Sequence, residues 1–73
     1  MSEVAAIGSG SQVAGFALAG ARVYLADDVD EIRAAWDALP APVAVVILTQ
    51  AAAAALAAER TAPQAPLTVV LPR

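Results

Sequence analysis

The sequence predicts a small doubly wound α/β domain, in which three helices flank a four-stranded parallel sheet of strand order 2-1-3-4, as in receiver-like and Rossmann-like folds. Two observations lead to this prediction. Apolar segments alternate with helix-like segments along the chain in the order β-α-β-α-β-α-β. The central apolar segment, Val43–Leu48, shows no alternation of apolar and polar residues, which is typical of a strand buried on both faces.

A first strand and a first helix are predicted at the start of the chain. Glu3–Ile7 is a short apolar run that ends at Gly8. The turn that follows contains Ser11, a residue type that favours the N-cap of a helix. Gln12–Ala19 is then predicted to be helical, with Gly20 at the position where a glycine commonly ends a helix.

A second strand and a second helix follow. Ala21–Ala26 is predicted as the strand, with Tyr24 half-buried on it. Asp28 is predicted to cap the helix, with Glu31 three residues later as its capping-box partner. Apolar side chains recur at helical spacing before Pro40, so we expect them to form one stripe that packs into the core. The stripe consists of Val29, Ile32, Trp36 and Leu39.

The last two strands enclose an alanine-rich helix. Thr49 follows the strand Val43–Leu48 and is predicted to cap a helix from Gln50 to about Arg60, since its alanine run has the highest helix propensity available. A proline-containing loop separates this helix from Leu67–Leu71, the predicted fourth strand.

The predicted topology leaves part of one sheet face without a helix. Right-handed crossovers place the first helix on one face, and the second and third helices on the other. The third and fourth strands are nevertheless apolar on both faces. The chain stops where a fourth helix would cover that bare side. We therefore expect either a partner that covers it or an exposed apolar patch, which is uncommon in monomers.

Length and composition exclude several classes of function. The 73 residues allow one domain, residues 1–73. The sequence contains no cysteine and no histidine, so it lacks the usual zinc ligands and the commonest general base. Four arginines against seven acidic residues, with net charge −3, do not form the basic face of a nucleic-acid binder. We expect no catalytic site, no bound metal and no cofactor.

One stretch invites a membrane interpretation, which we reject. Ala38–Ala58 carries no charge and is long enough to cross a bilayer. However, Pro40 and Pro42 interrupt its start, and a strand followed by a helix explains the same residues better. The first three residues also lack the basic region of a signal peptide. We expect a cytoplasmic protein.

Two motifs suggest chemistry that the sequence does not complete. Gly8–Gly15 resembles a dinucleotide-binding fingerprint, but Val13 occupies the place of the third glycine, so a tight turn with a helix N-cap is the preferred interpretation. A phosphoacceptor receiver site would need an aspartate after the third strand, where Thr49 stands. A nucleotide-binding fragment therefore stays a minor hypothesis.

Several segments resemble the F subunit of the V/A-type (vacuolar-type) ATPases. Val13–Gly20 is similar to the family's GF-x-LAG signature, which follows a strand ending in glycine. Asp28–Leu39 resembles its acidic-start helix, Val45–Thr49 its apolar strand ending in threonine, and Pro66–Pro72 its last strand between prolines. Two features depart from the family: Ser9 replaces an acidic residue, and the sequence ends before the usual C-terminal helix, as in a short form.

The resemblance implies a non-catalytic component of the central stalk, peripheral to the membrane. Such a component binds the coiled-coil D subunit of the rotor and helps couple ATP hydrolysis or synthesis to proton or sodium transport. By topology, we expect partner contacts at the turn containing Ser9, Ser11 and Gln12, and at the bare side near Phe16. The alternative is a receiver-like interaction module that acts as a homodimer without phosphoacceptor chemistry.

Overall fold

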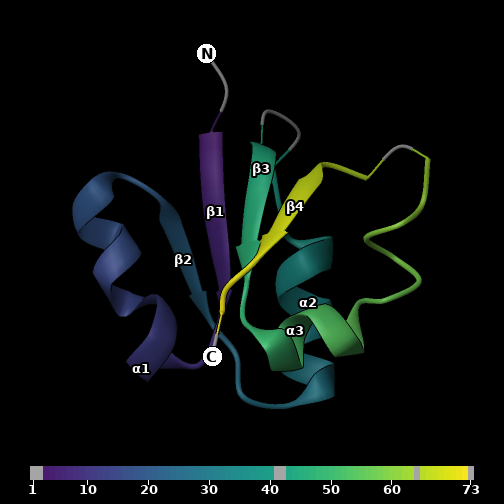
Figure 1. Cartoon of the computed structure of the whole chain (residues 1–73), viewed down its shortest axis with the longest axis horizontal. Helices are drawn as coiled ribbons and strands as arrows, with labels where there is room; N and C mark the ends of the chain where they lie inside the picture. Colours follow the sequence, from purple (N-terminus) through teal and green to yellow (C-terminus); the bar gives the residue numbers. More distant parts are fainter. Residues whose placement is uncertain (1–2, 41–42, 64, 73) are drawn as a thin grey trace.

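A four-stranded parallel sheet forms the centre of the molecule, and its strand order is β2-β1-β3-β4 (Figure 1). The predicted α/β class, strand order and parallel pairing are therefore confirmed. The computed structural model describes residues 3–40, 43–63 and 65–72. The strands are β1 (Glu3–Gly8), β2 (Arg22–Leu25), β3 (Val43–Leu48) and β4 (Leu67–Val70).

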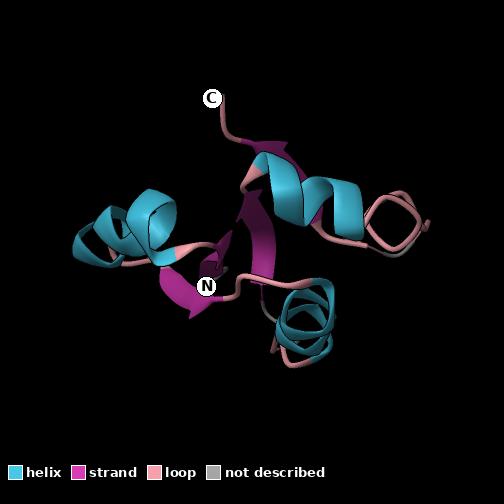
Figure 2. Cartoon of the chain, turned by 90° about the horizontal axis from the view of Figure 1, so that it is seen from below, coloured by secondary structure: helices cyan, strands magenta, loops and turns pink. Residues whose placement is uncertain are grey.

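The helices lie on the two sides of the sheet as right-handed crossovers require. They are α1 (Gly10–Val13), continued by the 3-10 helix η1 (Ala14–Ala19), then α2 (Val29–Asp37) and α3 (Gln50–Ala55). Figure 2, which looks nearly along the strands, shows the α1–η1 segment on one side of the sheet, and α2 and α3 on the other. The predicted distribution of the helices over the two faces is confirmed.

The main core lies between the sheet and the pair α2 and α3. Ile7, Val46 and Leu48 project from the two inner strands and are fully buried there. Leu56, the residue after α3, is fully buried against them. Ala52 and Ala53 are also buried in this layer, because their small side chains let the alanine-rich helix approach the sheet closely. Tyr24 is half-buried at the edge of this core, as predicted.

The start of α2 is fixed by two side chains. The Asp28 carboxylate accepts a hydrogen bond from the Glu31 backbone N–H at 2.8 Å. The Glu31 carboxylate accepts a hydrogen bond from the Asp27 backbone N–H at 2.9 Å. The predicted capping box would use the backbone N–H of Asp28, one residue later. In the predicted stripe, Ile32 is buried, whereas Val29 is 51% exposed and does not belong to the core.

Asp28→Ala is expected to lower the free energy of unfolding by about 1 kcal/mol, because the N–H of Glu31 loses its capping acceptor. Urea unfolding followed by circular dichroism measures the change. Asp30→Ala is the matched control, since Asp30 lies in the same first turn without accepting a capping hydrogen bond. Equal losses in the two variants would show that the cap does not stabilise α2.

The first helix begins earlier and is more irregular than predicted. It starts at Gly10 after Ser9, not at Gln12 after Ser11, and no side chain caps it. The Ser9 carbonyl instead accepts hydrogen bonds from the N–H groups of Gln12 and Val13. Gly15 disfavours a regular helix, and the chain tightens into 3-10 geometry from Ala14 onwards. Gly20 ends it with φ +93°, as predicted.

The third helix is shorter than predicted. It ends at Ala55, and residues 56–61 form successive turns, where a helix was predicted to about Arg60. The Thr61 hydroxyl donates to the carbonyls of Ala57 and Ala58, at 2.9 and 3.1 Å. These carbonyls would be unpaired in a helix ending at Arg60, so the hydroxyl satisfies the end of the segment. The regular pattern already breaks at Ala57, whose N–H donates to the carbonyl of Ala54, three residues back.

Candidate functional site

Strand register places two rows of apolar side chains on the face that carries α1 and η1. Val4, Val45 and Leu67 are aligned across β1, β3 and β4. Ala6, Ile47 and Val69 form the second row, two positions further along. Aligned residues of a parallel sheet project to the same face. We refer to Val4, Val45, Ile47, Leu67 and Val69 together as the open face.

Burial differs between the two sides of the sheet, although Ala6 on the open side is fully buried and Val70 of β4, on the side of α2 and α3, is 37% exposed. On the side of α2 and α3, Val46 and Leu48 are fully buried. On the open face, Val4 is 40%, Val69 48% and Leu67 68% exposed. The α1–η1 segment lies near β2 and β1, and in Figure 2 no helix stands over β3 and β4 on that side. The predicted bare side of the sheet is therefore present in the described residues.

A hollow runs along the boundary between η1 and the open face. It has a volume of about 490 Å³, and Phe16 of η1 lines it together with Val4 and Ile47 of the sheet. Phe16 is half-buried there. The remaining lining residues are Glu3, Ala19, Gly20 and Ala21. The hollow is mainly apolar, so it suits an aliphatic or aromatic side chain from another molecule.

The open face offers no charge to a partner. All five of its residues are aliphatic. At its edge, the Glu3 carboxylate pairs with the Arg22 guanidinium. The hydrogen bond from Arg22 to Glu3 and the charge of Glu3 raise the pKa of Arg22 above its ordinary value. A partner of this face is therefore expected to contribute mainly apolar side chains.

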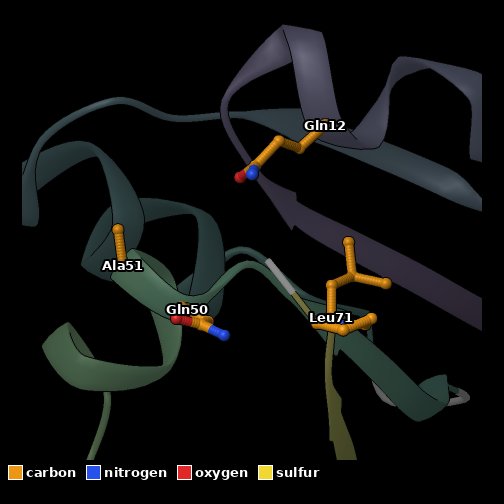
Figure 3. A pocket seen from close by; sticks show the side chains of 5 residues that line it. Gln12, Gln50, Ala51 and Leu71 are labelled. Carbon is orange, nitrogen blue, oxygen red and sulfur yellow. The ribbon is translucent and has the colours of Figure 1, made fainter.

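Three of the residues predicted to contact a partner lie at the carboxyl ends of the strands, away from the open face. Ser9 and Ser11 flank the start of α1, and their hydroxyl oxygens are 3.3 Å apart. Gln12 lines a second hollow of about 440 Å³ with Gln50 (Figure 3). The other residues around this hollow are Ala51, Leu71 and Pro72. Of the four predicted residues, Phe16 alone lines the hollow beside the open face.

The glycine-rich turn after β1 serves packing in this structure. A Cβ atom on Gly8 would lie 2.1 Å from Cγ2 of Thr49, so glycine allows the β1 end to meet the start of α3. Val13, at the position of the third fingerprint glycine, is fully buried. Within residues 3–40, 43–63 and 65–72, no group of three acidic side chains is placed to hold a metal ion.

Sequence reasoning missed the residues of the open face, although it predicted that a bare side exists. The signal was present in the uninterrupted apolar strand Val43–Leu48. Which half of its side chains lies under helices depends on the register with β1, and one sequence does not specify that register. In the described part of the chain, no helix has the length and apolar character needed to span a bilayer.

The fold and the open face define a small doubly wound module whose prominent surface feature is an exposed apolar sheet face. Comparison with protein families identifies it more closely: residues 4–72 match the family model described as ATP synthase (F/14-kDa) subunit. The chain therefore belongs to the F-subunit family of V/A-type ATPases. A search of curated proteins found no match.

Proposed function

We propose that residues 1–73 form one domain that acts as a non-catalytic central-stalk component of a V/A-type ATPase. In this role it binds the coiled-coil D subunit of the rotor on the cytoplasmic side of the membrane. It thereby helps couple ATP hydrolysis or synthesis to proton or sodium transport. Membership of the F-subunit family supports the assignment to the complex, and the open face is the observation that favours a docking role.

The backbone of the open face favours a helical partner. Strands β1 and β3 each have a neighbouring strand on both sides, so their backbone amides are already paired within the sheet. An extended segment laid across them would bury its own amide groups without hydrogen-bond partners, which is costly. A helix satisfies its amides internally and presents only side chains. One helix of a coiled coil therefore suits this face.

The four residues predicted from the sequence take different roles in this proposal. Phe16 contacts the partner from the hollow beside the open face. Ser9, Ser11 and Gln12 lie at the carboxyl ends of the strands, away from the open face, so in this proposal they contact only a partner that extends past the open face.

Isothermal titration calorimetry of the chain against a purified coiled coil of the D-subunit type from the same source tests the proposal. We expect saturable binding with a negative heat-capacity change, because apolar surface is buried. Absence of binding would contradict the assignment of the D subunit as the partner.

Val69→Glu is expected to weaken this binding at least about 100-fold, because an unpaired carboxylate buried in an interface costs about 3 kcal/mol or more. Val69 is half-exposed on the edge strand, so the substitution leaves the core intact. Val29→Glu is the matched control, since Val29 is similarly exposed on α2, on the other side of the sheet. Equal affinities of the two variants would place the partner elsewhere.

The second candidate function is a receiver-like module that works only as a homodimer. The same open face favours it, because an uncovered apolar sheet face also suits self-association. The two candidates differ in the calorimetric titration: a module of this second kind gives no heat with the coiled coil.

A further inference from the structure

The 3-10 helix η1 is apolar on its outer side as well as its inner side. We call Ala14–Ala19 the ridge, because it stands over the sheet beside the open face. Its sequence, Ala-Gly-Phe-Ala-Leu-Ala, contains no charged or polar side chain. Leu18 is 95% exposed, the most exposed of the large apolar residues in the described chain. Helices that are apolar all round are typical of buried positions, whereas Leu18 is exposed in the single chain.

The ridge and the open face lie next to each other on one side of the sheet. A half-turn about an axis roughly parallel to the strands brings the ridge of a second copy over the open face of the first. The same rotation brings the ridge of the first copy over the open face of the second. The surface is therefore complementary to itself, as a two-fold interface requires.

From this arrangement we propose that the free chain forms a two-fold dimer, in which the ridge of each copy packs on the open face of the other. Leu18 of one copy contacts Val69 and Ile47 of its partner. The two sheets then enclose a layer made of both ridges, so that each sheet gains the helix it lacks. The proposal deepens the second candidate function, the homodimer that uses the open face, and does not depend on a role in an ATPase.

Size and charge favour a second copy as the occupant. A stable dimer buries about 800 Å² from each partner, which is less than a fifth of the 4481 Å² of accessible surface of this chain. Neither the ridge nor the open face carries a charge, so the net charge of −3 on each copy is kept out of the contact.

Pairing through the β4 edge of the sheet is less suitable than pairing through the face. Strand β4 forms one edge of the sheet and contains only four residues. Pro66 and Pro72 lie just outside it, and proline cannot donate to a strand ladder. Short edges bounded by proline are a known protection against edge-to-edge association.

Sedimentation equilibrium of the full chain tests the dimer. At about 100 µM, a dissociation constant of about 10 µM leaves most chains paired, so we expect twice the 7.3-kDa chain mass. Leu18→Arg and Val69→Glu should each give the monomer mass, while Val29→Arg stays dimeric, because Val29 lies on α2. Circular dichroism checks that each variant is folded, and Leu18 is too exposed for its replacement to disturb the core.

Mixing the two disruptive variants tests the pairing of ridge with open face. In a mixed dimer, one contact keeps Leu18 against Val69, and the other brings Arg against Glu. A one-to-one mixture should therefore recover the dimer mass that neither variant gives alone. A monomeric wild-type chain, a dimeric Leu18→Arg variant, or no recovery in the mixture would each overturn the proposal. None of these results bears on binding to the coiled coil, which the calorimetric titration measures.

Discussion

Leu48→Ala is expected to lower the free energy of unfolding by about 3–5 kcal/mol, the largest effect of any substitution considered for this chain. Leu48 is fully buried on β3, where it packs against the layer formed by α2 and α3. Removing its side chain leaves a cavity that the paired strands cannot close. Since domains of this size are stable by only about 5 kcal/mol, the variant should be largely unfolded at physiological temperature. Urea unfolding in the cold measures the difference.

Leu67→Ala provides the matched comparison for this prediction. The same side chain is removed from the same sheet, but Leu67 is on the open face and mostly exposed. In dilute solution, where the chain is monomeric, Leu67→Ala should lower the free energy of unfolding by less than about 1 kcal/mol. Similar costs for Leu48→Ala and Leu67→Ala would show that the two faces of the sheet are equally covered in the free chain.

Gly8→Ala has the second-largest expected effect, a loss of about 2–3 kcal/mol in the free energy of unfolding. The new Cβ atom would lie 2.1 Å from Cγ2 of Thr49, a distance that forces β1 and the start of α3 apart. Thr49 also accepts the hydrogen bond that caps α3, from the N–H of Ala52 at 3.2 Å. Movement of Thr49 therefore weakens the cap in addition to the packing. Thermal unfolding followed by circular dichroism measures the loss.

Gly10→Ala separates the effect of crowding from the general effect of removing a glycine. A Cβ atom on Gly10 would meet only the Leu25 side chain, with Cδ2 at an ordinary 3.6 Å. Gly10 lies in α1, so alanine should be neutral or stabilise the chain by up to about 1 kcal/mol. If the Gly8 variant is as stable as the Gly10 variant, the close approach of Thr49 does not limit that position.

The fold was predictable because each strand is a separate apolar run with clear turn residues around it. Val43–Leu48 was predicted with its observed bounds, and the other strands differ by one residue at one or both ends. Asp28 was correctly predicted to cap the second helix, because an acidic residue of the type that caps helices directly precedes apolar residues at helical spacing. The strand order was predicted as the usual arrangement of small doubly wound domains, and the handedness of crossovers then placed the helices on the two faces of the sheet.

Details that depend on tertiary contacts were not predictable in the same way. The start of the first helix moved from Gln12 to Gly10, because backbone hydrogen bonds to Ser9 replaced the expected side-chain cap. The third helix ended early, because the regular pattern breaks at Ala57, whose N–H donates to the carbonyl of Ala54, three residues back. Helix propensity is a weak guide where such local alternatives compete.

The candidate site was predictable as a region but not as a set of residues. Counting helices showed that one side of β3 and β4 would be bare. The identity of Val45, Ile47 and Val69 as members of the open face depends on strand register, which a single sequence leaves open. Phe16 was placed near the bare side because it lies on the first helix, and it does line the hollow there.

The proposed dimer and the proposed stalk complex use the same face of the sheet. They therefore exclude each other on one chain, and the coiled coil is expected to dissociate the dimer when it binds. The free chain would then keep its apolar side covered before it joins the complex. This relation follows from the position of the open face, since the described chain places no helix of its own over β3 and β4 on that side.

Chemical labelling of a single cysteine tests most directly whether a partner covers the open face. The chain has no cysteine of its own, so Val69→Cys and Val29→Cys each introduce one thiol. The reaction of each thiol with a maleimide is measured in dilute solution with a saturating coiled coil of the D-subunit type. The rate for Val69→Cys should fall at least about tenfold, which corresponds to about 1.4 kcal/mol of protection. The rate for Val29→Cys should not change. If the coiled coil binds and Val69→Cys still reacts at its free rate, the open face is not the docking surface.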